Sequence, residues 1–329
     1  MEQEKTVEKA KAPKIRPIDT VRDLKHIRAK QWPEEEYIVS GHRACQGCAE
    51  VLAVRHVLKA LGPDTVAANA TGCMEIISSP LPTTAWAIPW IHVAFENAAA
   101  VGSGLEAGLK VLMRKGRLPQ KEIKAIAMAG DGGTADIGLQ ALSGALERGH
   151  DMIYFCFDNE AYMNTGGQRS GATPIYASTS TQPASTLTMG KIVEKKDLPA
   201  IVASHGVEYI ATASIAYLKD LQKKVKKAMF YHGSRYIQVD TPCPSVWGFP
   251  SDMTLEVGRL GVQSGLVPLF EMEHGKITNV RKIKEKIPVL DYLKTQKRFK
   301  HLADHTLAEK EVVRIQKKAD ANIDKYGLM

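Results

Sequence analysis

A short glycine-rich turn and an asparagine after the next strand carry the most specific chemical signal in the sequence. The turn is Gly130-Asp131-Gly132-Gly133, and Asn159 follows the next apolar segment. Backbone amides of such a turn, placed between a strand and a helix, can approach a phosphate. A carboxylate there would repel the phosphate unless a divalent cation lay between them, and Mg²⁺ is bound by oxygen ligands. These residues predict a diphosphate–Mg²⁺ site, although an N-capping aspartate in a tight turn would give part of the same pattern.

Four of the five cysteines form a second candidate site. Cys45 and Cys48 form a CxxC turn, Cys73 follows in the segment ATGC, and Cys243 lies in DTPCP. Four thiolates can bind zinc or a 4Fe–4S cluster. A CxxC pair can also carry out thiol redox chemistry, so the residue types alone leave these alternatives open. Cys156 lies within an apolar strand and is expected to be buried and inert.

Alternating apolar strands and helices are expected to position these residues. We predict strands at 65–69, 123–130, 152–157 and 236–243, and helices at 51–61, 97–114 and 135–149. Strands that are apolar on both faces are typical of a parallel sheet covered by helices on both sides, so the predicted fold is α/β, with a doubly wound, mostly parallel sheet. The Gly-, Ser- and Thr-rich segment 159–190 is too long for an idle connection and is expected to be a functional loop.

Composition sets limits on the function. The chain has 329 residues, with 44% hydrophobic and 24% charged residues and a net charge of +8. Much of the positive charge lies in residues 276–329, which contain 14 Lys and Arg against 7 Asp and Glu. We therefore expect an N-terminal arm (1–40), a central α/β domain (41–275) and a basic, helical C-terminal extension (276–329). Neither a nucleic acid nor a membrane is expected as a partner, and the absence of an apolar leader predicts a cytoplasmic protein with reduced cysteines.

Four separated segments together resemble one family. GHRACQGCAE, NATGC, the GDG turn and DNEAYMNTGGQRS are similar to the thiamine-diphosphate-binding β subunits of 2-oxoacid:ferredoxin oxidoreductases, over about residues 37–300. The resemblance implies a sheet of the thiamine-diphosphate-binding type and three cofactors: thiamine diphosphate, Mg²⁺ and a 4Fe–4S cluster. It assigns the cluster to Cys45, Cys48, Cys73 and Cys243, and Mg²⁺ to Asp131, Asn159 and the main-chain carbonyl of Ala161.

The same resemblance implies the residues that contact the cofactor. These are Glu50, Cys73, Gly130, Asp131, Gly132, Gly133, Asn159, Glu160, Ala161, Tyr162, Met163 and Asn164. Asn164 matches the family position that touches the 2-oxoacid and is the candidate catalytic residue. Gly133 departs from family members that have an aromatic residue after GDG, which leaves the packing at that position open. Met163 lies at a variable position that could affect substrate choice.

The implied activity is the coenzyme-A-dependent oxidative decarboxylation of pyruvate to acetyl-CoA and CO₂, with electrons passing through the cluster to ferredoxin. The chain would be active only with partner subunits: an α subunit that supplies the activating glutamate, together with ferredoxin-like and γ/δ subunits. The alternatives are the same chemistry on 2-oxoisovalerate, an aryl glyoxylate, 2-oxoglutarate or oxalate, and a non-redox thiamine diphosphate enzyme subunit with structural zinc.

Overall fold

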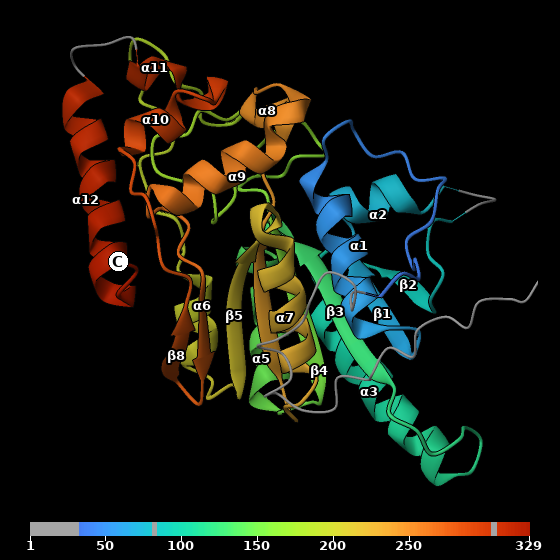
Figure 1. Cartoon of the computed structure of the whole chain (residues 1–329). Helices are drawn as coiled ribbons and strands as arrows, with labels where there is room; N and C mark the ends of the chain where they lie inside the picture. Colours follow the sequence, from blue (N-terminus) through green and yellow to red (C-terminus); the bar gives the residue numbers. More distant parts are fainter. Residues whose placement is uncertain (1–32, 81–83, 304–307) are drawn as a thin grey trace, which may run out of the picture.

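An eight-stranded sheet forms the centre of the molecule (Figure 1). The computed structural model describes residues 33–80, 84–303 and 308–329, so most of the expected N-terminal arm lies outside the described residues. The strand order is β2-β1-β3-β4-β6-β5-β7-β8, with the first six parallel. The parallel strands are β1 (Thr65–Ala70), β2 (Trp90–Val93), β3 (Lys124–Gly130), β4 (Met152–Asp158), β5 (Tyr209–Ser214) and β6 (Arg235–Asp240). The predicted mostly parallel α/β sheet is confirmed.

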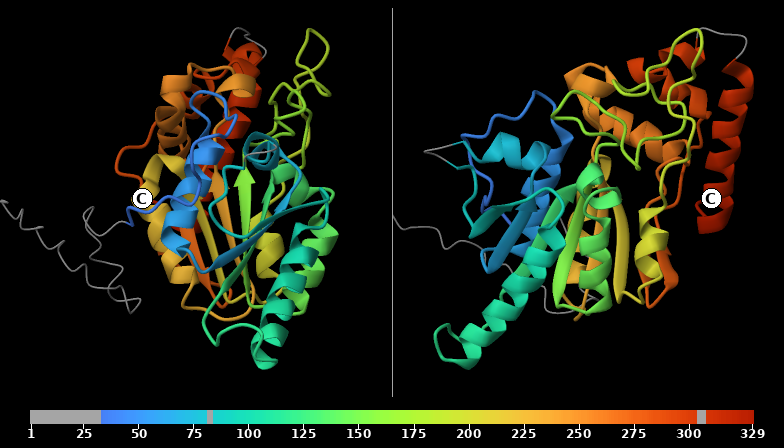
Figure 2. Two further views of the ribbon diagram at one scale, coloured as in Figure 1. Left: turned by 90° about the vertical axis from the view of Figure 1, so that its right-hand side faces the viewer. Right: turned by 180° about the vertical axis from the view of Figure 1, so that it is seen from behind.

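Helices cover both faces of these strands (Figure 2). Helices α1 (Ala49–Leu61) and α7 (Leu218–Ala228) lie on one face, and α3 (Ala98–Arg114), α5 (Leu139–Glu147) and α6 (Leu198–Ala203) lie on the other. Alternate residues of β3 enter the two cores: Ile126 and Met128 pack toward α1 and α7, whereas Ala125 and Ala127 pack toward α3. This division explains the continuous apolar runs in the sequence, because each face of the strand needs apolar side chains.

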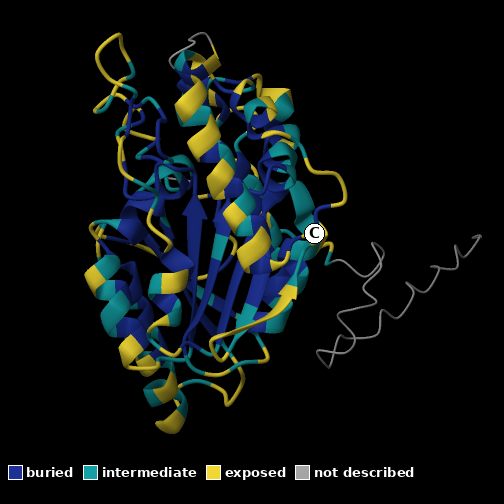
Figure 3. Ribbon diagram, turned by 90° about the vertical axis from the view of Figure 1, so that its left-hand side faces the viewer, coloured by how far each residue is buried: buried dark blue, intermediate teal, exposed yellow. Residues whose placement is uncertain are grey.

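A third layer lies over the carboxyl ends of the strands (Figure 1). It contains the loop 159–197 and the helices α8 (Pro244–Trp247), α9 (Thr254–Gln263), α10 (Val289–Leu293), α11 (Lys300–Ala303) and α12 (Glu309–Tyr326). Helix α12 buries Ile315, Ala319, Ile323 and Tyr326, while its opposite face is exposed (Figure 3). Helices α10, α11 and α12 lie within the predicted charged helical extension. Among the described helices, none is both long enough and apolar enough to cross a membrane.

The sheet continues beyond residue 275, where the sequence analysis placed the end of the central domain. Strands β7 (Phe270–Glu273) and β8 (Lys276–Val280) form an antiparallel hairpin that pairs with β5. The rings of Phe270 and Tyr326 stack with 4.5 Å between their centroids, which joins the end of α12 to this hairpin. Strand β8 has mostly exposed residues, and the sequence therefore lacks the apolar pattern that would predict it.

The predicted helix 135–149 is interrupted in the structure. Helix α4 (Asp131–Ala135) follows β3 without a connecting loop, and α5 begins only at Leu139. The break lies at Gly138, where a Cβ atom would overlap the carbonyl oxygen of Gly133. Two short elements, α2 (Cys73–Ser78) and β2, also escaped prediction because they are shorter than the periodicity needed to recognise them.

Candidate cofactor and cluster site

The ends of β3 and β4 bring the two predicted oxygen ligands to one edge of the sheet. Asp131 is the first residue of α4, and Asn159 directly follows β4. The two strands pair in parallel, with Gly130 opposite Phe157. Asp131 is 1% exposed and Asn159 is 6% exposed, so both polar side chains lie in a dry environment. The carboxyl edge of a parallel sheet is the usual place for a ligand in folds of this class.

Each of these two side chains has one buried oxygen without a hydrogen-bond partner. They are Oδ1 of Asp131 and Oδ1 of Asn159. The other polar atoms are engaged: Oδ2 of Asp131 accepts the hydroxyl of Ser170, and Nδ2 of Asn159 donates to Oε2 of Glu50 at 3.2 Å. Buried polar atoms in native proteins nearly always have a partner. Two unpartnered oxygens in this place fit a Mg²⁺ ion, which binds carboxylate and amide oxygens.

The charges around Asp131 also favour a cation. Burial, and next the neighbouring Asp158, raise the pKa of Asp131 well above its ordinary value, while the hydrogen bond from Ser170 and the charge of Lys195 oppose the rise. Two buried carboxylates side by side are unfavourable in their ionised forms. A divalent cation bound to Asp131 would supply the missing positive charge.

Close packing excludes a side chain at Gly132 and leaves little room for one at Gly133. A Cβ atom at Gly132 would overlap the ring of Tyr162, whose hydroxyl donates to Oδ2 of Asp136 at 2.8 Å. A Cβ atom at Gly133 would lie 3.3 Å from the carbonyl oxygen of Phe95. Phe95 therefore fills the space that a larger residue after GDG would need. Its ring packs against that of Tyr162, with 5.8 Å between the ring centroids.

The loop after β4 points its side chains in different directions. Glu160 has a left-handed backbone (φ 69°), and its carboxylate pairs with Lys195 at 2.8 Å and Arg298 at 2.6 Å. Only its backbone is therefore left for contact with a cofactor. Ala161 and Met163 are buried in the third apolar core, whereas Asn164 is exposed. Among the loop residues implied by the resemblance, Asn164 is thus the most exposed.

Three of the four cysteines stand at the starts of helices. Cys48 precedes α1, Cys73 begins α2, and Cys243 precedes α8. Cys45 is joined to Cys48 by a turn in which the Cys48 amide donates to the Cys45 carbonyl at 3.1 Å. The hydroxyl of Thr254 donates to the carbonyl of Gly47 at 2.8 Å and so holds this turn against the start of α9.

The four thiols are electrostatic neighbours. Burial, and next Glu50, raise the pKa of Cys48 to about 12, and Cys243 contributes. Burial likewise raises the pKa of Cys73, with further contributions from Glu50, Cys243 and Cys48. Burial also raises the pKa of Cys243, and Cys45 contributes there. Soft thiols that cluster and have no disulfide partner fit an iron–sulfur cluster, in which thiolates are the usual ligands.

No three His, Cys, Asp or Glu side chains converge on one point suited to a single metal ion anywhere in the described ranges. Cys156 is fully buried in β4, within the core that faces α3, as its apolar neighbours predict.

Several residues that shape the site escaped the sequence analysis. Ser170 binds Asp131, Trp247 donates its indole N–H to the carbonyl oxygen of Asn159 at 2.9 Å, and Lys195 and Arg298 pair with Glu160. One signal was available. Glu160 is the only acidic residue in the segment 159–190, and an acid that becomes buried needs a cationic partner. The sequence gives no indication that one of these partners lies more than one hundred residues further on.

Comparison with known proteins now identifies the family. Residues 70–239 match the model of the thiamine pyrophosphate enzyme C-terminal TPP-binding domain, which includes Cys73, Asp131 and Asn159. The chain is 50% identical over 299 residues to a pyruvate synthase subunit PorB of Methanocaldococcus jannaschii, covering 91% of this chain and 99% of the relative. The chain belongs to the PorB family of pyruvate synthase subunits. The predicted resemblance is thereby confirmed, as is the assignment to an oxidoreductase complex.

A second curated relative and one solved structure are also similar to this PorB-family chain. A ketoisovalerate oxidoreductase subunit VorB of Pyrococcus furiosus is 47% identical over 272 residues, covering 82% of this chain and 87% of the relative. A solved 2-oxoglutarate:ferredoxin oxidoreductase from Magnetococcus marinus superposes with a TM-score of 0.55 at 19% identity, covering 88% of this chain and 97% of that chain. This structural likeness shows a shared fold.

Proposed function

We propose that the chain is the thiamine-diphosphate- and cluster-binding β subunit of a pyruvate:ferredoxin oxidoreductase. The complex would convert pyruvate, coenzyme A and oxidised ferredoxin to acetyl-CoA, CO₂ and reduced ferredoxin. The family membership and the thiamine-pyrophosphate-binding domain support the reaction class.

The position of Asn159 is the observation that carries the proposal. Its side-chain amide donates to Glu50 and also lies 3.8 Å from the sulfur of Cys73, while its own side-chain oxygen is unpartnered. One residue therefore touches both the candidate Mg²⁺ site and the candidate cluster site. A redox enzyme needs this adjacency, because electrons must pass from the reacting carbon to the cluster.

The residues of this chain have separate tasks in the proposed site. Asp131, Asn159 and the carbonyl of Ala161 would hold Mg²⁺, and the glycine turn would let the diphosphate approach the backbone at the start of α4. When bound, thiamine diphosphate supplies the electron sink for decarboxylation, and the cluster supplies a one-electron path. Cys45, Cys48, Cys73 and Cys243 would hold the cluster, and the exposed Asn164 would contact the 2-oxoacid.

The proposed site needs a second polypeptide. The family model that matches this chain is a C-terminal domain of thiamine pyrophosphate enzymes, and the curated relatives are named as subunits. We propose that an α subunit supplies the glutamate that activates the cofactor, and that ferredoxin-like and γ/δ subunits complete the electron path. The exposed position of Asn164 next to a buried loop is consistent with coverage by such a partner.

The test is an anaerobic assay of the native complex. Coenzyme-A-dependent reduction of a viologen dye is measured with pyruvate, 2-oxoisovalerate, phenylglyoxylate, 2-oxoglutarate and oxalate, together with iron, acid-labile sulfide and zinc content. Fastest reduction with pyruvate and a content of four irons per chain in this subunit are expected. Stoichiometric zinc without iron, or the absence of reduction with every acid, would overturn the proposal.

A second candidate substrate has a specific observation in its favour. The VorB relative is 47% identical, close to the 50% of the PorB relative, so sequence similarity separates pyruvate from 2-oxoisovalerate only weakly. Faster reduction with 2-oxoisovalerate than with pyruvate in the same assay would keep the mechanism and change the substrate.

A further inference from the structure

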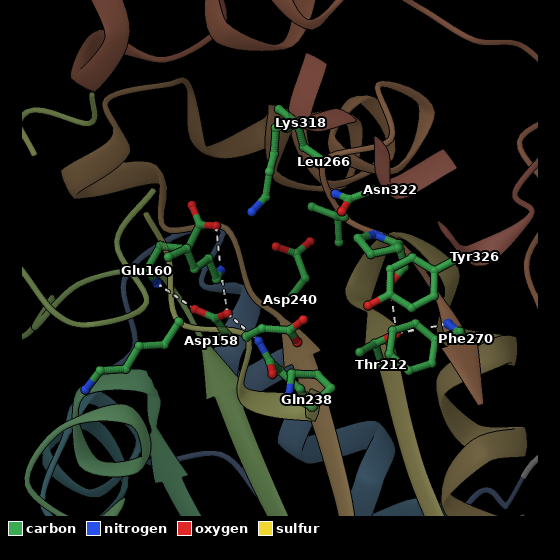
Figure 4. Close-up of a pocket in the computed structure, with 17 residues that line it drawn as sticks. Asp158, Glu160, Thr212, Gln238, Asp240, Leu266, Phe270, Lys318, Asn322 and Tyr326 are labelled. Carbon is green, nitrogen blue, oxygen red and sulfur yellow. Dashed lines mark hydrogen bonds and ion pairs between the residues drawn. The ribbon is translucent and has the colours of Figure 1, made fainter. Parts of the chain in front are cut away.

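A buried network of ion pairs lies directly behind the loop that carries the proposed Mg²⁺ ligands. Asp158 and Glu160 face a cavity of about 150 Å³, and the dashed lines in Figure 4 mark the interactions among the residues that line it. Lys195 bridges the two carboxylates, at 2.6 Å from Asp158 and 2.8 Å from Glu160. Arg298 binds the other oxygen of Glu160 at 2.6 Å. Lys195 and Arg298 thus neutralise two carboxylates that are almost fully buried.

Arg298 reaches Asn159 by two routes. Through its ion pair it holds Glu160, the next residue in the chain. Through stacking it holds Trp247, because the guanidinium carbon lies 3.6 Å from the centre of that ring. The indole N–H of Trp247 donates to the carbonyl oxygen of Asn159 at 2.9 Å. Arg298 is itself held by Gln296, whose side-chain oxygen accepts from Nε at 2.9 Å.

The backbone at Glu160 explains why the contacts of Arg298 and Trp247 with this loop, here called the clamp, are needed. A left-handed φ of 69° is strained for a residue with a Cβ atom, and it persists only where the surroundings enforce it. This turn sends the side chain of Glu160 toward Arg298 and Lys195, while the side chain of Asn159 extends toward Glu50 and Cys73. The hydroxyl of Thr173 donates to the carbonyl of Glu160 at 2.6 Å and adds a third attachment.

We propose that Arg298 and Trp247 are positioning residues for the Mg²⁺ site. They would fix Asn159 and the following carbonyl of Ala161 in the orientation that binds the ion. This inference rests on the proposed function, since it assumes that the ion bound there is the Mg²⁺ of thiamine diphosphate. The two residues lie outside the matched domain of residues 70–239, so the C-terminal segments complete a site whose ligands are inside it.

The planar guanidinium is the feature that the clamp requires. Only a flat, delocalised cation can stack on the indole and bind a carboxylate oxygen with the same group, whereas a lysine can make the ion pair alone. Arg298→Lys would therefore separate the two routes, and Trp247→Phe would remove the hydrogen bond to Asn159 while keeping a ring for stacking. Arg298→Gln would remove both the charge and much of the stacking.

The test uses the complete anaerobic complex with Mn²⁺ in place of Mg²⁺. The dissociation constant of Mn²⁺ in the presence of thiamine diphosphate, and the Mn²⁺ electron paramagnetic resonance spectrum, are compared among wild type and the three variants. Substitutions behind metal ligands typically weaken metal binding by about 10- to 100-fold. We expect a weakening in that range for Arg298→Gln, a smaller one for Arg298→Lys and Trp247→Phe, and an altered spectrum for all three.

A matched control is available in Arg314. It too lies over an aromatic ring, 5.9 Å from the centre of Tyr176, and it pairs with Glu194 at 2.9 Å, but it lies on the exposed face of α12. Arg314→Lys should leave Mn²⁺ binding unchanged. Thermal unfolding of the cofactor-free complexes and their iron content monitor general damage.

The outcomes distinguish a failure of the proposed function from a failure of the positioning role of Arg298 and Trp247. If wild type does not bind Mn²⁺ with thiamine diphosphate, the proposed function fails. If wild type binds it and Arg298→Gln and Trp247→Phe bind it equally well with an unchanged spectrum, the positioning role fails. Should Arg298→Gln not assemble, the two milder variants decide: wild-type Mn²⁺ affinity and spectrum in both would overturn the inference.

Discussion

Asp131→Asn tests the proposed Mg²⁺ site with the smallest possible change. The side chain keeps its shape, and its remaining oxygen can still accept the hydroxyl of Ser170. The substitution replaces the other oxygen, which is buried and unpartnered, with an amide nitrogen that cannot bind a cation. Removing one partner of a buried charge pair costs about 3–5 kcal/mol. At about 1.4 kcal/mol per tenfold, cofactor binding should weaken by roughly 10²-fold to a few thousand-fold.

The same change should not lower the stability of the cofactor-free protein. Asp131 is buried beside Asp158, and the neutral amide removes a repulsion between these carboxylates. We therefore expect thermal unfolding of the cofactor-free complex at or above the wild-type temperature. Weaker cofactor binding together with an unchanged or higher unfolding temperature distinguishes the loss of a metal ligand from damage to the fold.

The assay is equilibrium dialysis of thiamine diphosphate with Mg²⁺ under anaerobic conditions, with iron determined on the same samples. Asp151→Asn is the control, because Asp151 precedes β4 at its opposite end and pairs with Arg235. It should lower stability and leave the affinity unchanged. Wild-type affinity in Asp131→Asn would refute the assignment of the ion, and a parallel loss of iron would refute the separation of the two sites.

The remaining predictions address the cluster, the turn, the buried acid beside the cavity and the basic extension. Cys48→Ser should reduce the iron content of the complex while thiamine diphosphate binding persists, as shown by metal analysis and dialysis; retention of all iron would remove Cys48 from the ligand set. Gly132→Ala should reduce cofactor binding because its Cβ atom overlaps the ring of Tyr162, and dialysis should show recovery when Tyr162→Leu is added. Burial, and next Glu160, raise the pKa of Asp240 to about 8, whereas the pKa of an aspartate in the unfolded chain is about 3.9. The protonated carboxyl therefore favours the folded state, and this stabilisation is lost as the pH rises from the lower pKa to the higher one. Asp240→Asn should therefore raise the unfolding temperature more at pH 7.5 than at pH 5, and an equal shift at both would contradict the assignment. Replacing the exposed Lys284, Lys310 and Lys317 by Gln should slow ferredoxin reduction several-fold at low salt and flatten its salt dependence, as measured by stopped flow; an unchanged rate would indicate that the extension binds partner subunits instead.

The sequence predicts the site where the chemistry depends on strand ends. Asp131 and Asn159 each follow an apolar strand, and neighbouring parallel strands must deliver their ends to one edge. The fold class follows from the same apolar runs, because residues such as Ala125 and Ile126 face opposite cores. Local pattern is sufficient for these features, since each depends on a few adjacent residues and one general rule of sheet topology.

The sequence does not predict the contacts that depend on chain segments far apart. The resemblance places Glu160 among the cofactor contacts, yet its carboxylate is bound by Lys195 and Arg298. The break at Gly138 depends on a carbonyl oxygen that approaches from Gly133, which no propensity encodes. These features become visible only when the segments are packed together.

The loop after β4 places a constraint on how substrate preference can evolve. The same short peptide carries the proposed metal ligands and Asn164, the position proposed to contact the substrate, and most of its side chains are buried or paired. Met163, which the resemblance places at a variable position, is buried in the third core, so its replacement would disturb that packing. Asn164 and Thr165 are exposed, so their side chains are not part of this core. A mutant library seeking a new 2-oxoacid preference should therefore diversify Thr165 first, keep the candidate catalytic residue Asn164, and leave the rest of the loop intact.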